Sequence, residues 1–125
     1  MTTWQTAEIN PIILKENISI DNVCLQMKAS SDLFQFQGHF PEKSIFPGVG
    51  QLDWAVKFGQ KYFKHNRAVI GVNQLKFKKF IEPDLQFAMS LIYLRDKNQI
   101  TFKYGLIEEG LQDCFSSGVL KLSDD

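Results

Sequence analysis

The chain has 125 residues, with 14 basic and 14 acidic side chains, so its formal net charge at neutral pH is zero. A balanced charge argues against nucleic-acid binding over the whole surface, and this length predicts a single domain, residues 1–125, with a sizeable core. No stretch of about 18 apolar residues and no signal-peptide pattern occurs, so we expect a cytoplasmic protein without a membrane span.

The cysteine pattern argues against metal or disulfide chemistry. Cys24 and Cys114 are far apart in the sequence and fall in apparent strands. No CxxC motif or Cys/His ligand spacing occurs. We therefore expect two buried, reduced thiols and no metal site.

The first half of the chain predicts one strand, a loop and one helix. Residues 18–29 alternate apolar and polar side chains, which predicts a strand. Residues 30–47 carry turn formers without a clean period and predict a loop. Residues 49–63 have apolar side chains three and four apart, which predicts an amphipathic helix that starts after Pro47. The predicted apolar stripe is Val49, Leu52, Val56, Gly59 or Gln60, and Phe63.

The second half predicts strands joined by short turns. They cover residues 69–80, the alternating run from Phe87 to Tyr93, residues 100–106 and residues 112–122. Short connections between consecutive strands favour an antiparallel meander. The single helix must bury its apolar stripe against this sheet. The predicted class is therefore α+β, with one helix wrapped by an antiparallel sheet.

Two residues near the helix start suggest acid–base chemistry. Asp53 falls about 40° around the helix from Val49, inside the predicted stripe, where a carboxylate is costly unless paired or neutral. It is either a structural aspartate favoured by the helix dipole or a functional carboxylate. His39, in a loop constrained by Gly38 and Pro41, is either a structural hydrogen-bonding residue or a general base. The residues alone leave both choices open.

These residues belong to a longer pattern that resembles a known family. Gly38-His39-Phe40-Pro41, Pro47-Gly48-Val49 and Leu52-Asp53 together resemble the active-site motif of the 3-hydroxyacyl-acyl-carrier-protein dehydratases, which are FabA/FabZ-like. The version GVGQLDWA is most similar to the ApeI-like thioester dehydratases of aryl polyene synthesis. The resemblance implies the hot-dog fold, in which an antiparallel sheet wraps one long central helix.

The resemblance also implies roles for individual residues. His39 matches the family's catalytic histidine, Asp53 its acidic partner, and Gly48 the glycine whose backbone N–H binds the thioester carbonyl. The accompanying substrate-binding residues are Phe40, Pro47 and Val49. In the family the histidine and the acid come from opposite subunits, which implies a homodimer with its sites at the interface and leaves room for a higher oligomer or a heteromer.

The implied reaction is dehydration of 3-hydroxyacyl thioesters to trans-2-enoyl thioesters in fatty-acid or aryl-polyene-type lipid synthesis. The thioester would be carried by acyl carrier protein or coenzyme A, and no cofactor is expected. The alternatives on the same fold are an acyl thioesterase and a non-catalytic module that binds acyl carriers or only dimerises. Ser44, where the family usually has proline, and Gly50, where it often has a larger apolar residue, leave the substrate's shape open.

Charge is distributed unevenly along the chain. All the charged residues between Asp53 and Glu82 are basic. The predicted docking patch for an acidic carrier protein is Lys57, Lys61, Lys64 and Arg67. An ordinary solvated helix face explains these residues equally well. His65, in the same basic segment, is expected to be solvated or to act as a cation at the helix C-terminus.

Overall fold

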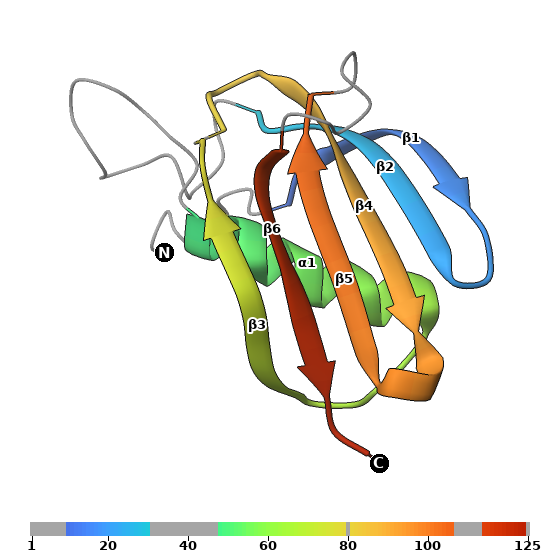
Figure 1. Ribbon diagram of the computed structural model, residues 1–125. Coiled ribbons are helices and arrows are strands. Elements are labelled where there is room, and N and C mark those ends of the chain that lie inside the picture. The colour runs from blue at the N-terminus through green and yellow to red at the C-terminus, as the bar shows by residue number, and fades with distance from the viewer. Residues whose placement is uncertain (1–9, 31–47, 80, 107–113, 125) are drawn as a thin grey trace, which may run out of the picture.

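In a computed structural model of the chain we describe residues 10–30, 48–79, 81–106 and 114–124. The elements are β1 (Ile12–Ile18), β2 (Asn22–Lys28), α1 (Gly48–Phe63), β3 (Val69–Phe77), β4 (Gln86–Leu94), β5 (Gln99–Gly105) and β6 (Cys114–Leu122). The strands form one sheet in the order β1-β2-β4-β5-β6-β3, and α1 lies across one face of it (Figure 1). All neighbouring strands are antiparallel, which confirms the predicted α+β class.

Aromatic side chains hold the helix against the sheet. Trp54 is fully buried, and its ring lies parallel to that of Phe87 on β4, with the ring centroids 6.3 Å apart. At the C-terminal end of α1, the ring centroids of Phe63 and Tyr93 lie 5.2 Å apart. Burial of such large apolar surfaces is the main free-energy gain in a core of this kind. These contacts fix the middle and the C-terminal end of α1 against β4.

The buried face of α1 differs in part from the predicted stripe, of which Gly59 and Phe63 are buried as predicted. Trp54, Ala55 and Phe58 are buried, whereas Leu52 and Val56 are only half-buried. The larger apolar area of the two aromatic residues explains this rotation, because burying Trp54 and Phe58 removes more apolar surface from water. The prediction that Asp53 lies on the core face is wrong: Asp53 is exposed in the single chain.

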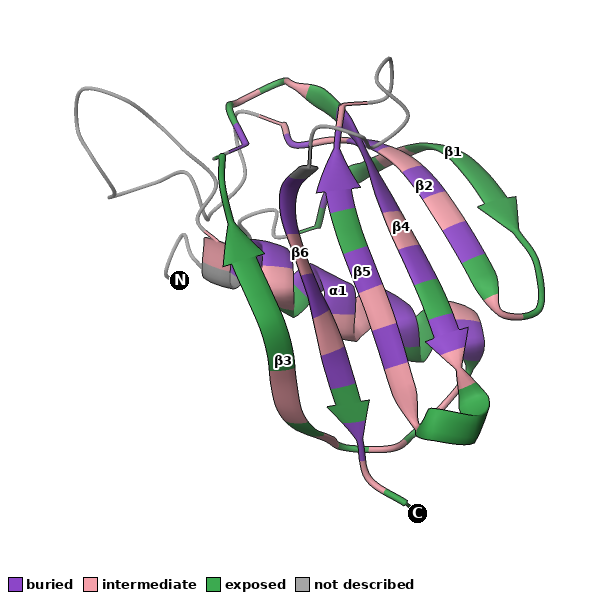
Figure 2. Cartoon of the chain, in the orientation of Figure 1, coloured by how far each residue is buried: buried purple, intermediate pink, exposed green. Residues whose placement is uncertain are grey.

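Strands β4 and β5 follow the predicted alternation. The alternating side chains on the helix-facing side of β4 are all buried, and the same holds for β5 (Figure 2). These residues are Phe87, Met89, Leu91 and Tyr93 on β4, and Ile100, Phe102 and Tyr104 on β5. Each strand thus buries one face, as a period of two requires.

The predicted strand over residues 18–29 is in fact part of a hairpin. Ile18 ends β1, the backbone N–H of Ser19 donates to the carbonyl of Asn22 at 2.7 Å, and β2 then runs back beside β1. The slip in the alternation near Asp21 marks this turn. Strand β1 escaped prediction because most of its side chains are exposed, so burial imposes no alternating pattern on it.

The predicted four-stranded meander is also wrong in one respect. Strands β4, β5 and β6 form a meander, but β3 pairs with β6 at the far edge of the sheet rather than with β4. The segment around Pro83 is not a hairpin turn, because it leads from edge strand β3 to β4, which lies beside β2. There the backbone N–H of Asp84 donates to the carbonyl of Ala29 at 2.7 Å. Strand β3 ends at Phe77, three residues before the predicted end. Within the described residues, no helix is long and apolar enough to cross a membrane.

Candidate active site

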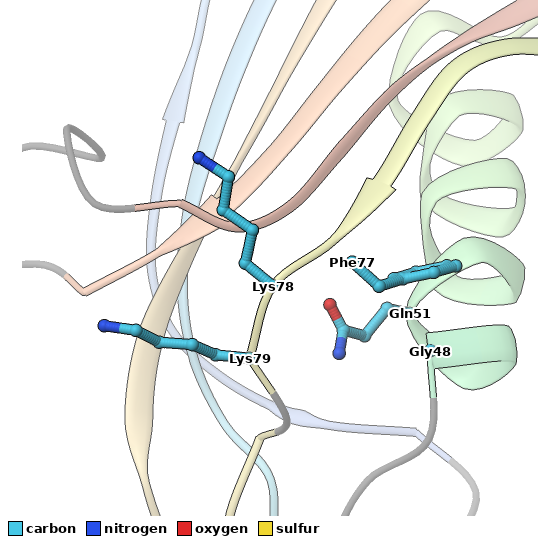
Figure 3. Close-up of a pocket in the computed structure, with 5 residues that line it drawn as sticks. All are labelled: Gly48, Gln51, Phe77, Lys78 and Lys79. Carbon is cyan, nitrogen blue, oxygen red and sulfur yellow. The ribbon is translucent and has the colours of Figure 1, made fainter.

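A pocket of about 150 Å³ lies where α1 begins, beside the end of β3 (Figure 3). Its lining residues are Gly48, Gln51, Phe77, Lys78 and Lys79. The first backbone N–H groups of a helix have no acceptor within that helix, and they carry the positive end of the helix dipole. A pocket at this place can therefore bind an oxygen atom that carries or develops negative charge.

Gly48 is the first residue of α1, so the helix starts one residue before the predicted range of 49–63. A Cβ atom at this position would lie 2.9 Å from two carbons of the Phe77 ring, which is closer than real Cβ contacts come. The glycine thus lets the ring pack directly against the helix start. Gly48 also lines the pocket, and its role in holding a thioester carbonyl stays a prediction.

Gln51 is a polar residue of the pocket that was not among the predicted site residues. It is fully buried, and the hydroxyl of Tyr104 on β5 donates to its backbone carbonyl at 2.7 Å. The hydroxyl of Ser116 on β6 donates to Gln51 Oε1 at 2.5 Å. Among the described residues, Gln51 Nε2 has no hydrogen-bond partner. In the sequence, the position of Gln51 on the same helix face as Trp54 and Phe58 could have indicated a buried polar residue.

Asp53 lies outside the pocket lining, on the exposed side of α1. Its charge still acts on the core. Burial raises the pKa of Tyr104 well above its usual value, and the negative charge of Asp53 raises it further. Tyr104 therefore remains a protonated donor at neutral pH. The Asp53 carboxylate itself remains accessible to a group from another molecule.

Several predicted site residues lie outside the described part of the chain. His39, Phe40, Pro47 and Ser44 lie outside the described residues, and so does the side chain of Val49. The pairing of His39 with Asp53 therefore stays a prediction. Gly50, which the sequence analysis noted as a departure from the family, is buried in the first turn of α1.

The predicted carrier-protein patch lies toward the C-terminal end of α1, away from the pocket. At about 1.5 Å per residue, Lys61 is about 20 Å along the axis from Gly48. Lys57 is half-buried and donates to Asn10 at 2.8 Å, and Arg67 is half-buried and donates to the Asn98 side chain. Exposed within the patch are Lys61 and Lys64.

Two other lysines border the pocket itself. The backbone N–H groups of Lys78 and Lys79 donate to the carbonyl of Phe115 at 2.7 and 3.1 Å, which fixes this segment against β6. Both side chains are exposed at the pocket rim, and Figure 3 shows their ammonium groups extending away from Gln51. In the sequence, two adjacent lysines directly after a strand, in the span without acidic residues, could have indicated a basic surface here.

His65 and Cys24 lie outside the pocket lining. His65 is half-buried, its Nδ1 accepts from the backbone N–H of Arg67 at 3.1 Å, and its pKa is lowered by burial and then by the Arg67 charge. The prediction of a cation at the helix end is therefore corrected. Cys24 is a free thiol that is half-buried rather than buried as predicted, and burial raises its pKa.

Comparisons with known proteins agree with this geometry. The family model of the ApeI dehydratases matches residues 15–119. The 3-hydroxyacyl-[acyl-carrier-protein] dehydratase FabZ of Buchnera aphidicola subsp. Schizaphis graminum is 30% identical over 92 residues. The match covers 66% of this chain and 60% of that enzyme's length.

Solved structures show the same fold. The dehydratase heterocomplex ApeI:P from Xenorhabdus doucetiae has a TM-score of 0.81 at 24% identity, covering 90% of this chain and 97% of that one. An uncharacterized protein from Erwinia carotovora subsp. atroseptica has a TM-score of 0.79 at 28% identity, covering 91% and 96%. These matches confirm the predicted hot-dog fold. Because the family model extends over most of the chain, this protein belongs to the ApeI-like dehydratase family.

Proposed function

We propose that this protein dehydrates 3-hydroxyacyl thioesters to trans-2-enoyl thioesters, with acyl carrier protein as the thioester carrier, in fatty-acid or aryl polyene synthesis. The observation that carries the proposal is the family match over residues 15–119, which includes a glycine-started helix at a pocket. The FabZ relative is named as a dehydratase of carrier-bound 3-hydroxyacyl groups.

The reaction removes a proton from C2 and hydroxide from C3 of the acyl chain. The backbone N–H of Gly48 holds the thioester carbonyl oxygen, where negative charge develops as C2 loses its proton. His39 in its neutral form takes this proton. Asp53 gives a proton to the departing C3 oxygen, directly or through a water molecule, so that water leaves and the C2–C3 double bond forms.

We also propose that the active site is completed by a second copy of the chain. The exposed Asp53 supports this, because its carboxylate is accessible to a group that a second chain would bring to it. The edge strand β3 also exposes apolar side chains at Ile70, Leu75 and Phe77, which a partner would cover. In the dimer, His39 of one copy would face Asp53 of the other.

A heteromer is the alternative assembly. The Xenorhabdus doucetiae relative is described as a heterocomplex. Mass measurement of the purified chain in solution distinguishes the two, because an active homodimer needs no second gene product.

Carrier-protein docking has two candidate surfaces in this proposal. The first is the predicted patch of Lys57, Lys61, Lys64 and Arg67. The second is the lysine pair at the pocket rim, Lys78 and Lys79. An acidic carrier must bring its thioester to Gly48. The Lys78 and Lys79 pair lies nearer to Gly48 than the patch on the helix does.

The function is tested by incubating the purified chain with a chain-length series of 3-hydroxyacyl thioesters. Dehydration produces an ultraviolet-absorbing enoyl thioester with no free thiol. Release of free thiol would identify a thioesterase instead, and tight binding without turnover would identify a non-catalytic carrier-binding module.

A further inference from the structure

We propose that Gln51 donates a second hydrogen bond, from Nε2, to the thioester carbonyl oxygen that Gly48 holds. This inference rests on the proposed dehydratase function and adds a residue to its machinery. The pocket would then stabilise the developing enolate oxygen with two donors, one from the backbone and one from a side chain.

The starting observation is the state of the Gln51 amide. The residue is fully buried, yet Nε2 has no hydrogen-bond partner among the described residues. Buried polar atoms almost always have partners, so an exception needs an explanation. Here the unpartnered atom belongs to a residue that lines the pocket. A ligand with an acceptor oxygen would satisfy it.

The helix geometry places this donor near Gly48. Gln51 follows Gly48 by three residues, which is nearly one turn, so the two lie on the same face of α1. Helical side chains lean toward the N-terminus, so the Gln51 side chain covers the turn that begins at Gly48. Figure 3 shows its amide end extending from α1 toward the segment that carries Lys78 and Lys79.

The amide is also held in a fixed orientation. Ser116 donates to Oε1 at 2.5 Å, which leaves Nε2 as the end of the amide that is free to donate. Tyr104 donates to the backbone carbonyl of the same residue at 2.7 Å and fixes this turn of the helix against β5. A donor that is already oriented needs no reorganisation when charge develops, and this is the property that makes such donors effective in catalysis.

The chemical step is the one proposed above. When His39 removes the C2 proton, the electron pair of the C–H bond moves toward the carbonyl, and negative charge collects on its oxygen. Hydrogen bonds to that oxygen strengthen as the charge grows, so they favour the transition state over the bound substrate. Departure of the C3 hydroxyl, protonated by Asp53, then returns the electron pair to form the double bond.

The acceptor for Gln51 Nε2 has one alternative, which is an amide carbonyl of the carrier's pantetheine arm. Contact there would strengthen binding equally before and during the reaction. Its loss would raise KM without lowering kcat. The two positions are therefore separated by steady-state kinetics.

The experiment compares the wild-type chain with Gln51→Met/Ser116→Ala and with Ser116→Ala alone. The double variant removes both polar partners and fills the space with an apolar side chain, so it should keep or raise Tm. With a 3-hydroxyacyl N-acetylcysteamine thioester, we expect kcat to fall by about 100-fold and KM to stay within about threefold. Ser116→Ala keeps the donor but loosens it, so its kcat should fall by less than about tenfold.

Other outcomes overturn the proposal. A double variant with wild-type kcat shows that Gln51 does not bind the reacting oxygen, and a rise in KM alone moves the contact to the carrier arm. A lower Tm with a proportionate loss of kcat shows that Gln51 is structural. A wild-type chain without dehydratase activity would instead refute the proposed function itself.

A spectroscopic measurement does not depend on turnover. The side-chain amide signal of Gln51 is assigned by its absence from the Gln51→Met spectrum. Addition of a saturated acyl N-acetylcysteamine thioester should shift this signal in the direction of stronger hydrogen bonding. An unchanged signal at saturating ligand contradicts the proposal.

Discussion

The ring of Phe77 at the end of β3 lies directly over Gly48 at the start of α1, so that a Cβ on Gly48 would come within 2.9 Å of two ring carbons. This contact joins the edge strand of the sheet to the helix that carries the candidate catalytic groups. It also forms one wall of the pocket.

Gly48→Ala should therefore damage both the fold and the site. Overpacking of this kind typically costs about 1–3 kcal/mol, offset only in part by the better helix preference of alanine. For a chain of this size we expect Tm to fall by about 4–12 °C, together with most of the dehydratase activity. Thermal unfolding and turnover of a soluble thioester measure the two effects.

The matched control for this substitution is Gly71→Ala on β3. The nearest atom to a Cβ on Gly71 is 3.9 Å away, so this variant should keep its Tm and its activity. The double variant Gly48→Ala/Phe77→Leu should recover part of the lost stability. No recovery would mean that the Phe77 contact is not the cause of the damage.

Asp53→Asn tests the catalytic acid. Because Asp53 is exposed in the single chain, the substitution should leave the folding of that chain intact. An amide cannot deliver the proton that the leaving hydroxyl needs, so kcat should fall by at least about 100-fold. The exposed Asp96 in the turn after β4 provides a matched control, Asp96→Asn, with expected wild-type activity. A mild effect at Asp53 would reduce it to a structural residue.

Charge reversal tests the two candidate docking surfaces. If the carrier docks at the pocket rim, Lys78→Glu/Lys79→Glu should raise KM for a carrier-bound substrate about tenfold or more, because like charges then repel the acidic carrier. Turnover of the small N-acetylcysteamine thioester should change little. Lys61→Glu/Lys64→Glu is the matched comparison at the other end of α1. The opposite pattern would assign docking to the helix patch.

Substitutions on the two edge strands of the sheet test the proposed dimer. Ile70 on β3 is 62% exposed and Leu14 on β1 is 46% exposed, each on an edge strand of the sheet. Ile70→Lys should weaken a dimer formed through β3 and lower activity at low protein concentration, because an unpaired charge would be placed in the interface. Leu14→Lys should not. Light scattering across a dilution series measures both, and an unaffected dimer excludes β3 as its interface.

His65 predicts a pH dependence of stability. Its pKa in the folded chain is lowered, so just below pH 6.5 the unfolded chain binds more protons than the folded one. The contribution of His65 is present above this pH and is lost as the pH falls toward the folded pKa. His65→Asn keeps a side-chain acceptor for the Arg67 N–H but does not titrate. Between pH 7.5 and pH 5, Tm should fall more in the wild-type chain than in this variant.

The sequence determined the elements whose signal is local. The helix was predicted to within one residue, and the alternation from Phe87 to Tyr93 identified β4, because burial of one face imposes its period directly on the sequence. The motif around Gly48 likewise placed this glycine at the helix start and suggested the family. These features depend on residues that are close together in the sequence, so they can be predicted from it.

Only the tertiary structure decided which surfaces meet. Strand β3 lies beside β6, far along the chain, and no local period reports such a pairing. Trp54 and Phe58 are buried more fully than Leu52, because the face with more aromatic area gains more from burial, and this rotation leaves Asp53 exposed. The proposed role of Gln51 also depends on the tertiary structure. Its burial and its unpartnered Nε2 arise only when β5 and β6 pack against it.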